Sequence, residues 1–140
     1  MKVRDIMTTT TQTILPDATL EQAAKKMRDY DVGLLPIVAN NRVLGVITDR
    51  DLVVRAMAAG YNPHLTVVRE IMTSRALWCY DDQTVSEAAK AMEANKVRRL
   101  VILDRNFALA GVLTLTDIAT KAGYDRMPGH VLNRVASKAG

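Results

Sequence analysis

The chain repeats itself, and this feature restricts the folds open to it more than any other. The residues V-R-D-I-M-T at 3–8 return as V-R-E-I-M-T at 68–73, an offset of 65. With this offset, 11 of the 25 positions in residues 3–27 are identical to their partners in residues 68–92. One inserted residue later, G-V-I-T-D-R-D at 45–51 aligns with G-V-L-T-L-T-D at 111–117. Two copies of one supersecondary unit, each of about 60 residues, therefore fill most of the chain.

Composition narrows the class further. The chain has 140 residues, of which 49% are hydrophobic and 24% charged, a balance typical of a globular protein and too apolar for a disordered one. The single cysteine excludes an intrachain disulfide, and without a CxxC or Cys/His cluster we expect no metal site. The longest apolar run, residues 107–113, is far shorter than the roughly 18 residues of a membrane-spanning helix. The N-terminus has no apolar secretion signal, so we expect a cytoplasmic protein without a membrane partner.

The distribution of charge argues against nucleic acid as a partner. The formal net charge is +4, and the last twenty residues, with four basic side chains and one acidic, carry 4 − 1 = +3 of it. The remaining body is nearly neutral, and aromatic residues make up only 4% of the chain. A nucleic-acid-binding protein is expected to have a basic stripe on its folded body and aromatic side chains for stacking.

Each copy is predicted to alternate helix and strand, which gives an α+β unit. Thr19 with Gln22 and Thr84 with Glu87 form capping boxes, and apolar residues at helical spacing follow each of them. Strands are predicted over residues 32–38 and 43–47 in the first copy, and over 97–103 and 109–113 in the second. A second helix is predicted to begin near Thr48 and near Thr114. Because a 60-residue unit has little core of its own, the two copies are expected to pack their sheets together.

The chain resembles a tandem pair of cystathionine-β-synthase (CBS) domains, also called a Bateman module. The twice-used V-R-[DE]-I-M-T segment, the [DQ]-x-T-[LV]-x-x-A-A-K-x-M helix and the two G-V-[IL]-T-x-x-D segments carry the resemblance over residues 1 to about 120. The resemblance is to a stand-alone pair. It implies β-α-β-β-α order in each CBS repeat, packing through the sheets with pseudo-twofold symmetry, and a cleft that often binds adenine nucleotides. It also implies a homodimer.

On this basis we predict three parts of the chain. The first CBS domain is placed at residues 1–62, the second at 63–122, and a basic C-terminal tail at 123–140. The tail is interpreted either as a frayed end or as a segment that covers a sheet edge, a dimer interface or another protein.

The T-x-x-D segments are open to two interpretations. A Thr and an acid three residues later, where a strand gives way to a helix, form a helix cap. The resemblance implies instead that the acid binds the ribose diol, whose two hydroxyls match two acceptor oxygens, and that the Thr lies near the sugar or phosphate. The two roles are compatible. The candidate residues are Thr48, Arg50, Asp51, Thr114, Thr116 and Asp117.

Arg98 and Arg99 are adjacent in the most apolar strand of the second copy. They are either solvated charges that discourage edge-to-edge aggregation or phosphate-binding guanidinium groups. The resemblance favours the second role and couples both arginines to a ligand held by Asp51. Because the first copy has Gly33 and Leu34 at these positions, the two sites are predicted to be unequal.

The resemblance also places candidates for an adenine slot before the first helix, at Thr13, Ile14 and Pro16, with Trp78 and Cys79 among their counterparts. Trp78 is equally consistent with core or dimer packing. Cys79 is interpreted as a small buried hydrophobe in preference to a redox switch.

No nucleophile, base and orienting group occur together along the chain, so we predict that it is not an enzyme and needs no obligatory cofactor. The function expected from the resemblance is regulatory sensing of an adenosine-containing ligand: AMP, ADP, ATP or S-adenosylmethionine. Its effector protein is unidentified. The alternative is a structural or protein-interaction module that has an unoccupied cleft and acts through dimerisation.

Overall fold

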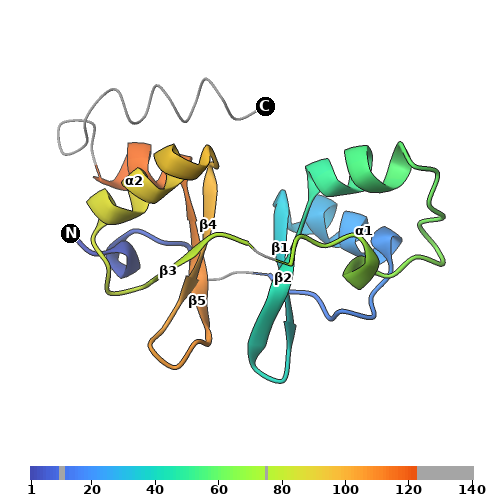
Figure 1. Ribbon diagram of the computed structural model, residues 1–140, viewed down its shortest axis with the longest axis horizontal. Coiled ribbons are helices and arrows are strands. Elements are labelled where there is room, and N and C mark those ends of the chain that lie inside the picture. The colour runs from blue at the N-terminus through green and yellow to red at the C-terminus, as the bar shows by residue number, and fades with distance from the viewer. Residues whose placement is uncertain (10–11, 75, 123–140) are drawn as a thin grey trace. The chain divides into compact units, whose positions relative to one another are not determined.

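The computed structural model describes residues 1–9, 12–74 and 76–122. The predicted tail at 123–140 lies outside the described residues. The architecture is α+β, as predicted, and the chain divides into two compact units (Figure 1). The first-repeat unit is Gln12–Ala76, and the second-repeat unit combines Met1–Thr11 with Leu77–Gly140.

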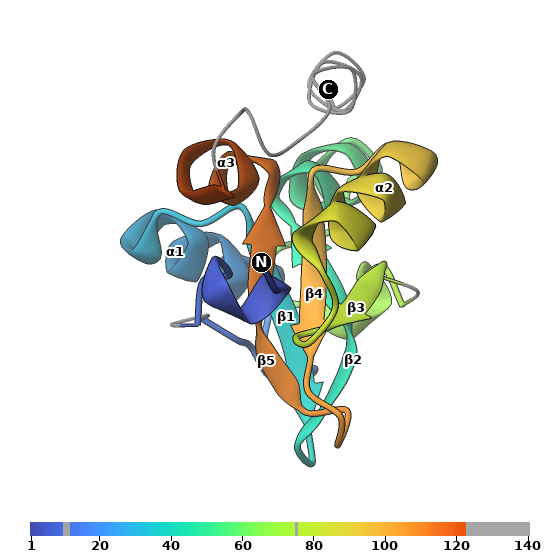
Figure 2. The same ribbon diagram turned by 90° about the vertical axis from the view of Figure 1, so that its left-hand side faces the viewer.

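The second-repeat unit follows the implied β-α-β-β-α order (Figure 2). Strand β4 lies in the middle of a three-stranded sheet, parallel to β3 and antiparallel to β5. Strands and helices alternate in this unit: β3 (Trp78–Tyr80), α2 (Val85–Asn95), β4 (Arg99–Leu103), β5 (Leu109–Thr114), α3 (Leu115–Asp117) and η4 (Ile118–Ala122).

The first-repeat unit has the same order but lacks a full first strand. Its elements are α1 (Leu20–Tyr30), β1 (Leu34–Ala39), β2 (Arg42–Thr48) and η2 (Asp51–Met57). A single parallel bridge between Ile14 and Ile37 replaces the strand. Pro16 explains the difference, because it has no N–H to continue the pairing. At the equivalent position of the other unit, the amide of Asp81 donates to Leu103 at 2.9 Å.

Both predicted capping boxes form. The Oγ1 atoms of Thr19 and Thr84 accept the amides of Gln22 and Glu87, at 3.2 and 3.1 Å. The second helix of each unit begins near the predicted threonine and then widens into π-type turns over η2 and η4. None of the helices in the described part of the chain has the length and apolar character needed to cross a membrane.

The two opening segments, residues 3–8 and 68–73, are exchanged between the repeats. Short turns η1 (Val3–Asp5) and η3 (Val68–Glu70) lie in these segments. Val3 and Ile6 pack into the core of the second-repeat unit, whereas Val68 and Ile71 pack into the core of the first-repeat unit. The compact units therefore do not coincide with the contiguous ranges 1–62 and 63–122. Both views show the blue N-terminal turn beside the second repeat (Figures 1 and 2).

Each opening segment ends in a bridge to the last strand of its unit. Thr8 pairs with Val112, and Thr73 pairs with Val46. The residue before each bridged valine is a glycine, and a Cβ on Gly111 would lie 2.5 Å from the carbonyl oxygen of Thr8. The glycine of G-V-[IL]-T is thus required because the opening segment approaches the strand so closely.

Candidate ligand-binding site

The T-x-x-D segment of each unit forms a reciprocal cap. Thr48 donates its amide to Asp51 Oδ2 at 3.0 Å, and its Oγ1 accepts the Asp51 amide at 3.1 Å. Thr114 and Asp117 repeat the arrangement, with both distances at 3.0 Å. The capping interpretation is therefore confirmed. The cap also fixes the aspartate side chain that would bind a ribose diol. It holds the Oδ2 atom of each aspartate and leaves Oδ1 outside the cap.

Both acids are buried, with 7% of Asp51 and 8% of Asp117 exposed. A buried carboxylate requires a charged partner or hydrogen bonds. The partner is the basic residue four positions later: Arg55 Nη1 lies 3.6 Å from Asp51 Oδ1, and Lys121 Nζ lies 3.2 Å from Asp117 Oδ1. Each carboxylate oxygen accepts about two hydrogen bonds. Each oxygen therefore keeps capacity for one hydroxyl donor.

Arg55 and Lys121 were not identified from the sequence. The signal was present, because both lie four residues after the aspartate and are related by the offset of 66. Their side chains are half exposed, at 50% and 47%. They complete an arrangement of threonine, acid and base that both units share.

The start of the middle strand lies beside this arrangement. Arg99 is the register partner of Thr114, and the carbonyl of Arg98 accepts the amide of Leu115 at 2.8 Å. The structure thus brings both arginines next to Thr114 and Asp117 of their own unit, a place we call the Asp117 corner. Arg98 is exposed there and Arg99 is half-buried. Their predicted coupling to Asp51 joins two units and stays a prediction.

The equivalent Asp51 corner of the first-repeat unit, at Thr48 and Asp51, has uncharged residues at the positions of Arg98 and Arg99. Leu34 is the register partner of Thr48, and the carbonyl of Gly33 accepts the amide of Asp49 at 3.0 Å. Arg50 is exposed, and its amide donates to Asp49 Oδ1 at 2.8 Å. The two corners therefore share one backbone geometry and differ in charge.

The remaining predicted residues have backbone partners. Thr116 is exposed, and its carbonyl accepts the Thr120 hydroxyl at 2.8 Å. The carbonyl of Thr13 accepts Lys26 Nζ, and that of Pro16 accepts the Arg69 amide.

Ile14 is fixed between two residues of β1. Its amide donates to Pro36 and its carbonyl accepts from Val38, both at 3.0 Å, and its side chain lies in the core. The adenine slot at these residues stays a prediction.

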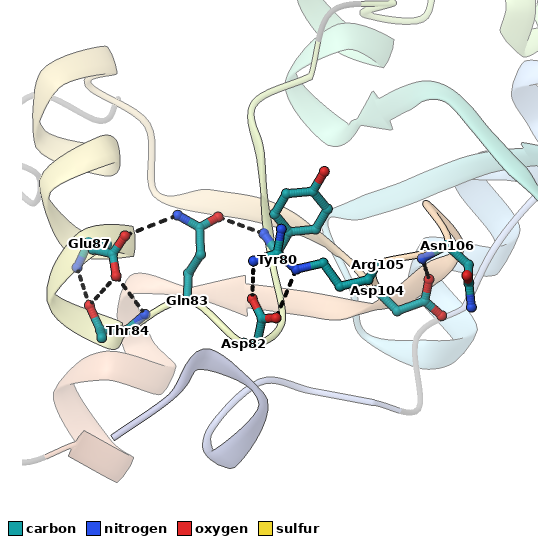
Figure 3. Close-up of polar contacts among 8 residues, drawn as sticks. All are labelled: Tyr80, Asp82, Gln83, Thr84, Glu87, Asp104, Arg105 and Asn106. Atoms are coloured by element: carbon teal, nitrogen blue, oxygen red, sulfur yellow. Dashed lines mark hydrogen bonds and ion pairs between the residues drawn. The ribbon is translucent and has the colours of Figure 1, made fainter.

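The counterpart of the slot in the second-repeat unit is an aromatic cluster. Trp78 lies edge-on to Tyr80 and Phe107, with centroids 5.0 and 6.0 Å away. Arg105 stacks over Tyr80 at 3.8 Å and forms two 2.8 Å hydrogen bonds with Asp82 (Figure 3). This contact holds the pKa of the Asp82 carboxyl below its ordinary value. Trp78 is 41% exposed, so it is not a core residue.

Cys79, between these aromatic residues, points to the opposite face and is buried in the core. Burial, with a smaller contribution from Glu87, raises the pKa of its thiol to about 11. The thiol is therefore protonated at neutral pH. This supports its interpretation as a small hydrophobe.

Among residues 1–9, 12–74 and 76–122, no three histidine, cysteine, aspartate or glutamate side chains gather into a potential metal site. His64 pairs instead with Glu21 on α1.

The two repeats also match known proteins. Residues 3–57 and 68–123 each match the model of the CBS domain. The CBS domain-containing protein YhcV of Bacillus subtilis is 31% identical over 134 residues, which cover 96% of this chain and 94% of that protein.

Two solved structures are similar along most of the chain. Hypoxic Response Protein I, described with two coordinated zinc ions, is 32% identical, with a TM-score of 0.78 over 86% of this chain and 98% of that one. The CBS domain pair of MJ0100, in complex with 5′-methylthioadenosine and S-adenosyl-L-methionine, is 25% identical. Its TM-score is 0.78, over 88% of this chain and 100% of that one.

Proposed function

The chain belongs to the CBS-domain family, and on that premise we propose that it is a regulatory module that binds an adenosine-containing small molecule. The observation that carries the proposal is the capped, buried aspartate of each unit, which keeps acceptor capacity on both carboxylate oxygens. A ribose diol offers two hydroxyl donors, one for each carboxylate oxygen. We assign Asp51 and Asp117 to the diol, and the threonines of the same segments to positioning these acids.

S-adenosylmethionine and AMP are the ligands to test first. The MJ0100 domain pair, which is similar over 88% of this chain, is described in complex with S-adenosyl-L-methionine. The AMP proposal rests on Arg98 and Arg99, because guanidinium groups match the geometry of phosphate. We propose that AMP, ADP or ATP binds more tightly than adenosine wherever these arginines reach the ligand. The module acts by sensing and not by catalysis.

The test is calorimetric titration of the wild type and of Asp51→Asn with S-adenosylmethionine, AMP and adenosine. Asparagine keeps an oxygen for the Thr48 amide but replaces the second acceptor with a donor. Loss of one hydrogen bond to a buried hydroxyl should weaken binding about 5- to 100-fold at that site. Asp29→Asn removes the same charge from an exposed position of α1 and should bind as the wild type does. A wild-type chain that binds none of the three compounds would refute the proposed function.

A second candidate function, assembly through a homodimer, is favoured by one observation. Helix η2 exposes Val53, Val54 and Met57, at 54%, 49% and 71%. The helix of the other unit has Ala119 and Thr120 where η2 has the two valines. We propose that a second copy of this chain covers the η2 face. Sedimentation of the wild type and of Met57→Lys tests this, and a wild type that stays monomeric at micromolar concentration refutes it.

A further inference from the structure

A second contact of Arg55 and Lys121 connects each capped aspartate to an opening segment. Lys121 Nζ contacts Asp117 Oδ1 and also donates to the carbonyl of Ile6, both at 3.2 Å. Ile6 lies 115 residues away in the sequence, inside the opening segment that completes the core of this unit. One ammonium group therefore joins the T-x-x-D cap to the N-terminal end of the chain.

Arg55 makes the equivalent connection in the first-repeat unit. Its Nη1 lies 3.6 Å from Asp51 Oδ1, 3.4 Å from the carbonyl of Met72 and 3.4 Å from Thr73 Oγ1. Met72 and Thr73 end the opening segment of residues 68–73. The side chain differs between the units, but its charge, its position after the aspartate and its two kinds of partner are the same. An ordinary i,i+4 ion pair on a helix surface involves that helix alone, whereas both of these cations also contact a second segment of the chain.

We propose that Arg55 and Lys121 are positioning residues that couple ligand binding at each aspartate to the docking of the opening segment. This inference rests on the proposed function. The threonine amide holds one carboxylate oxygen and the cation holds the other, so the plane of the carboxylate is set before the diol arrives. Such preorganisation improves affinity because less freedom is lost on binding. The cation is in turn held by the carbonyl of the opening segment.

Thermodynamic reciprocity then requires an effect in the opposite direction. If the docked opening segment favours binding of the ligand, the ligand must favour the docked segment by the same factor. The shorter contacts of Lys121 indicate stronger coupling in the second-repeat unit than Arg55 provides in the first. Ligand occupancy would thereby be read at residues 3–8, whose amides pair with the second repeat at Val3, Arg4 and Thr8.

The test replaces Lys121 with Met, which keeps the length of the side chain and removes the charge. The variant is made in an Asp51→Asn background, so that Asp117 is the acid under study, and is titrated with S-adenosylmethionine and AMP. We expect affinity to fall about fivefold, at the lower end of ordinary coupling between sites. We also expect ligand-induced protection of the amides of residues 3–8 from hydrogen exchange to be lost. Lys121→Arg should restore both properties, and Lys90→Met, which removes an exposed charge on α2, should change neither.

The outcomes separate the two proposals. If the background chain binds ligand and Lys121→Met binds it equally well, or if bound ligand leaves exchange at residues 3–8 unchanged, the coupling is refuted and the proposed function stands. If neither the background chain nor the wild type binds any of the compounds, the proposed function fails, and the coupling fails with it.

Discussion

The exchange of opening segments predicts that a substitution near the N-terminus destabilises the second repeat and not the first. The perturbation is Val3→Ala. Val3 is fully buried and belongs to the same core cluster as Leu100 and Ile102 of β4. Val68→Ala is the matched perturbation, because Val68 is equally buried in the core of the first-repeat unit.

The magnitude follows from the groups removed. Valine to alanine deletes two methyl groups, each worth about 0.8 kcal/mol when buried, or about 1.6 kcal/mol together. The cavity left behind adds to this, so we expect a loss of about 2–3 kcal/mol in the free energy of unfolding. Thr9→Ala is the control: Thr9 is exposed in the same part of the chain, and its substitution should change stability by less than about 0.5 kcal/mol.

Two measurements assign the loss to a unit. Trp78 is the only tryptophan and lies in the second-repeat unit, so denaturation followed by its fluorescence reports on that unit. Hydrogen exchange then compares residues 99–114 with residues 34–48. Val3→Ala should accelerate exchange first in residues 99–114, and Val68→Ala first in residues 34–48. If Val3→Ala instead acts on residues 34–48, each opening segment packs against its own repeat and the reasoning is wrong.

Three further predictions concern single positions. Gly111→Ala should lower the free energy of unfolding by about 1–3 kcal/mol in chemical denaturation, because the new Cβ would meet the carbonyl of Thr8; an unchanged midpoint would contradict the close approach. Cys79 should react with a thiol reagent at pH 8 only after unfolding, and rapid labelling of the native protein would contradict its burial. The free energy of unfolding should fall as the pH rises from about 9 toward 11, because the folded state favours the protonated thiol. Thr84→Ala should lower the free energy of unfolding, measured by thermal denaturation, by about 1 kcal/mol, because the Glu87 amide loses its cap. A variant as stable as the wild type would show that the capping box does not stabilise the fold.

The sequence by itself determined the elements and the local geometry of the site. Capping boxes, apolar stripes and strand runs depend on residues within a few positions of one another, so the repeated sequence predicted the same helices and strands twice. The same is true of the caps of Asp51 and Asp117, in which threonine and acid stand three residues apart. A departure from the expected strand order, the missing first strand at Pro16, also has a local cause, although it was not predicted.

Only the tertiary structure decided which core each opening segment completes and what lies beyond each aspartate. The two V-R-[DE]-I-M-T segments are so alike that each is compatible with either core, and pattern alone cannot choose between them. The choice depends on contacts far apart in the sequence, such as Val3 with Gln83 and Lys121 with Ile6. The packing of Trp78 against Phe107 depends on tertiary structure for the same reason. Periodicity and spacing in the sequence indicate which face of a helix or strand is buried. The segment that packs against that face is fixed only when the whole chain has folded.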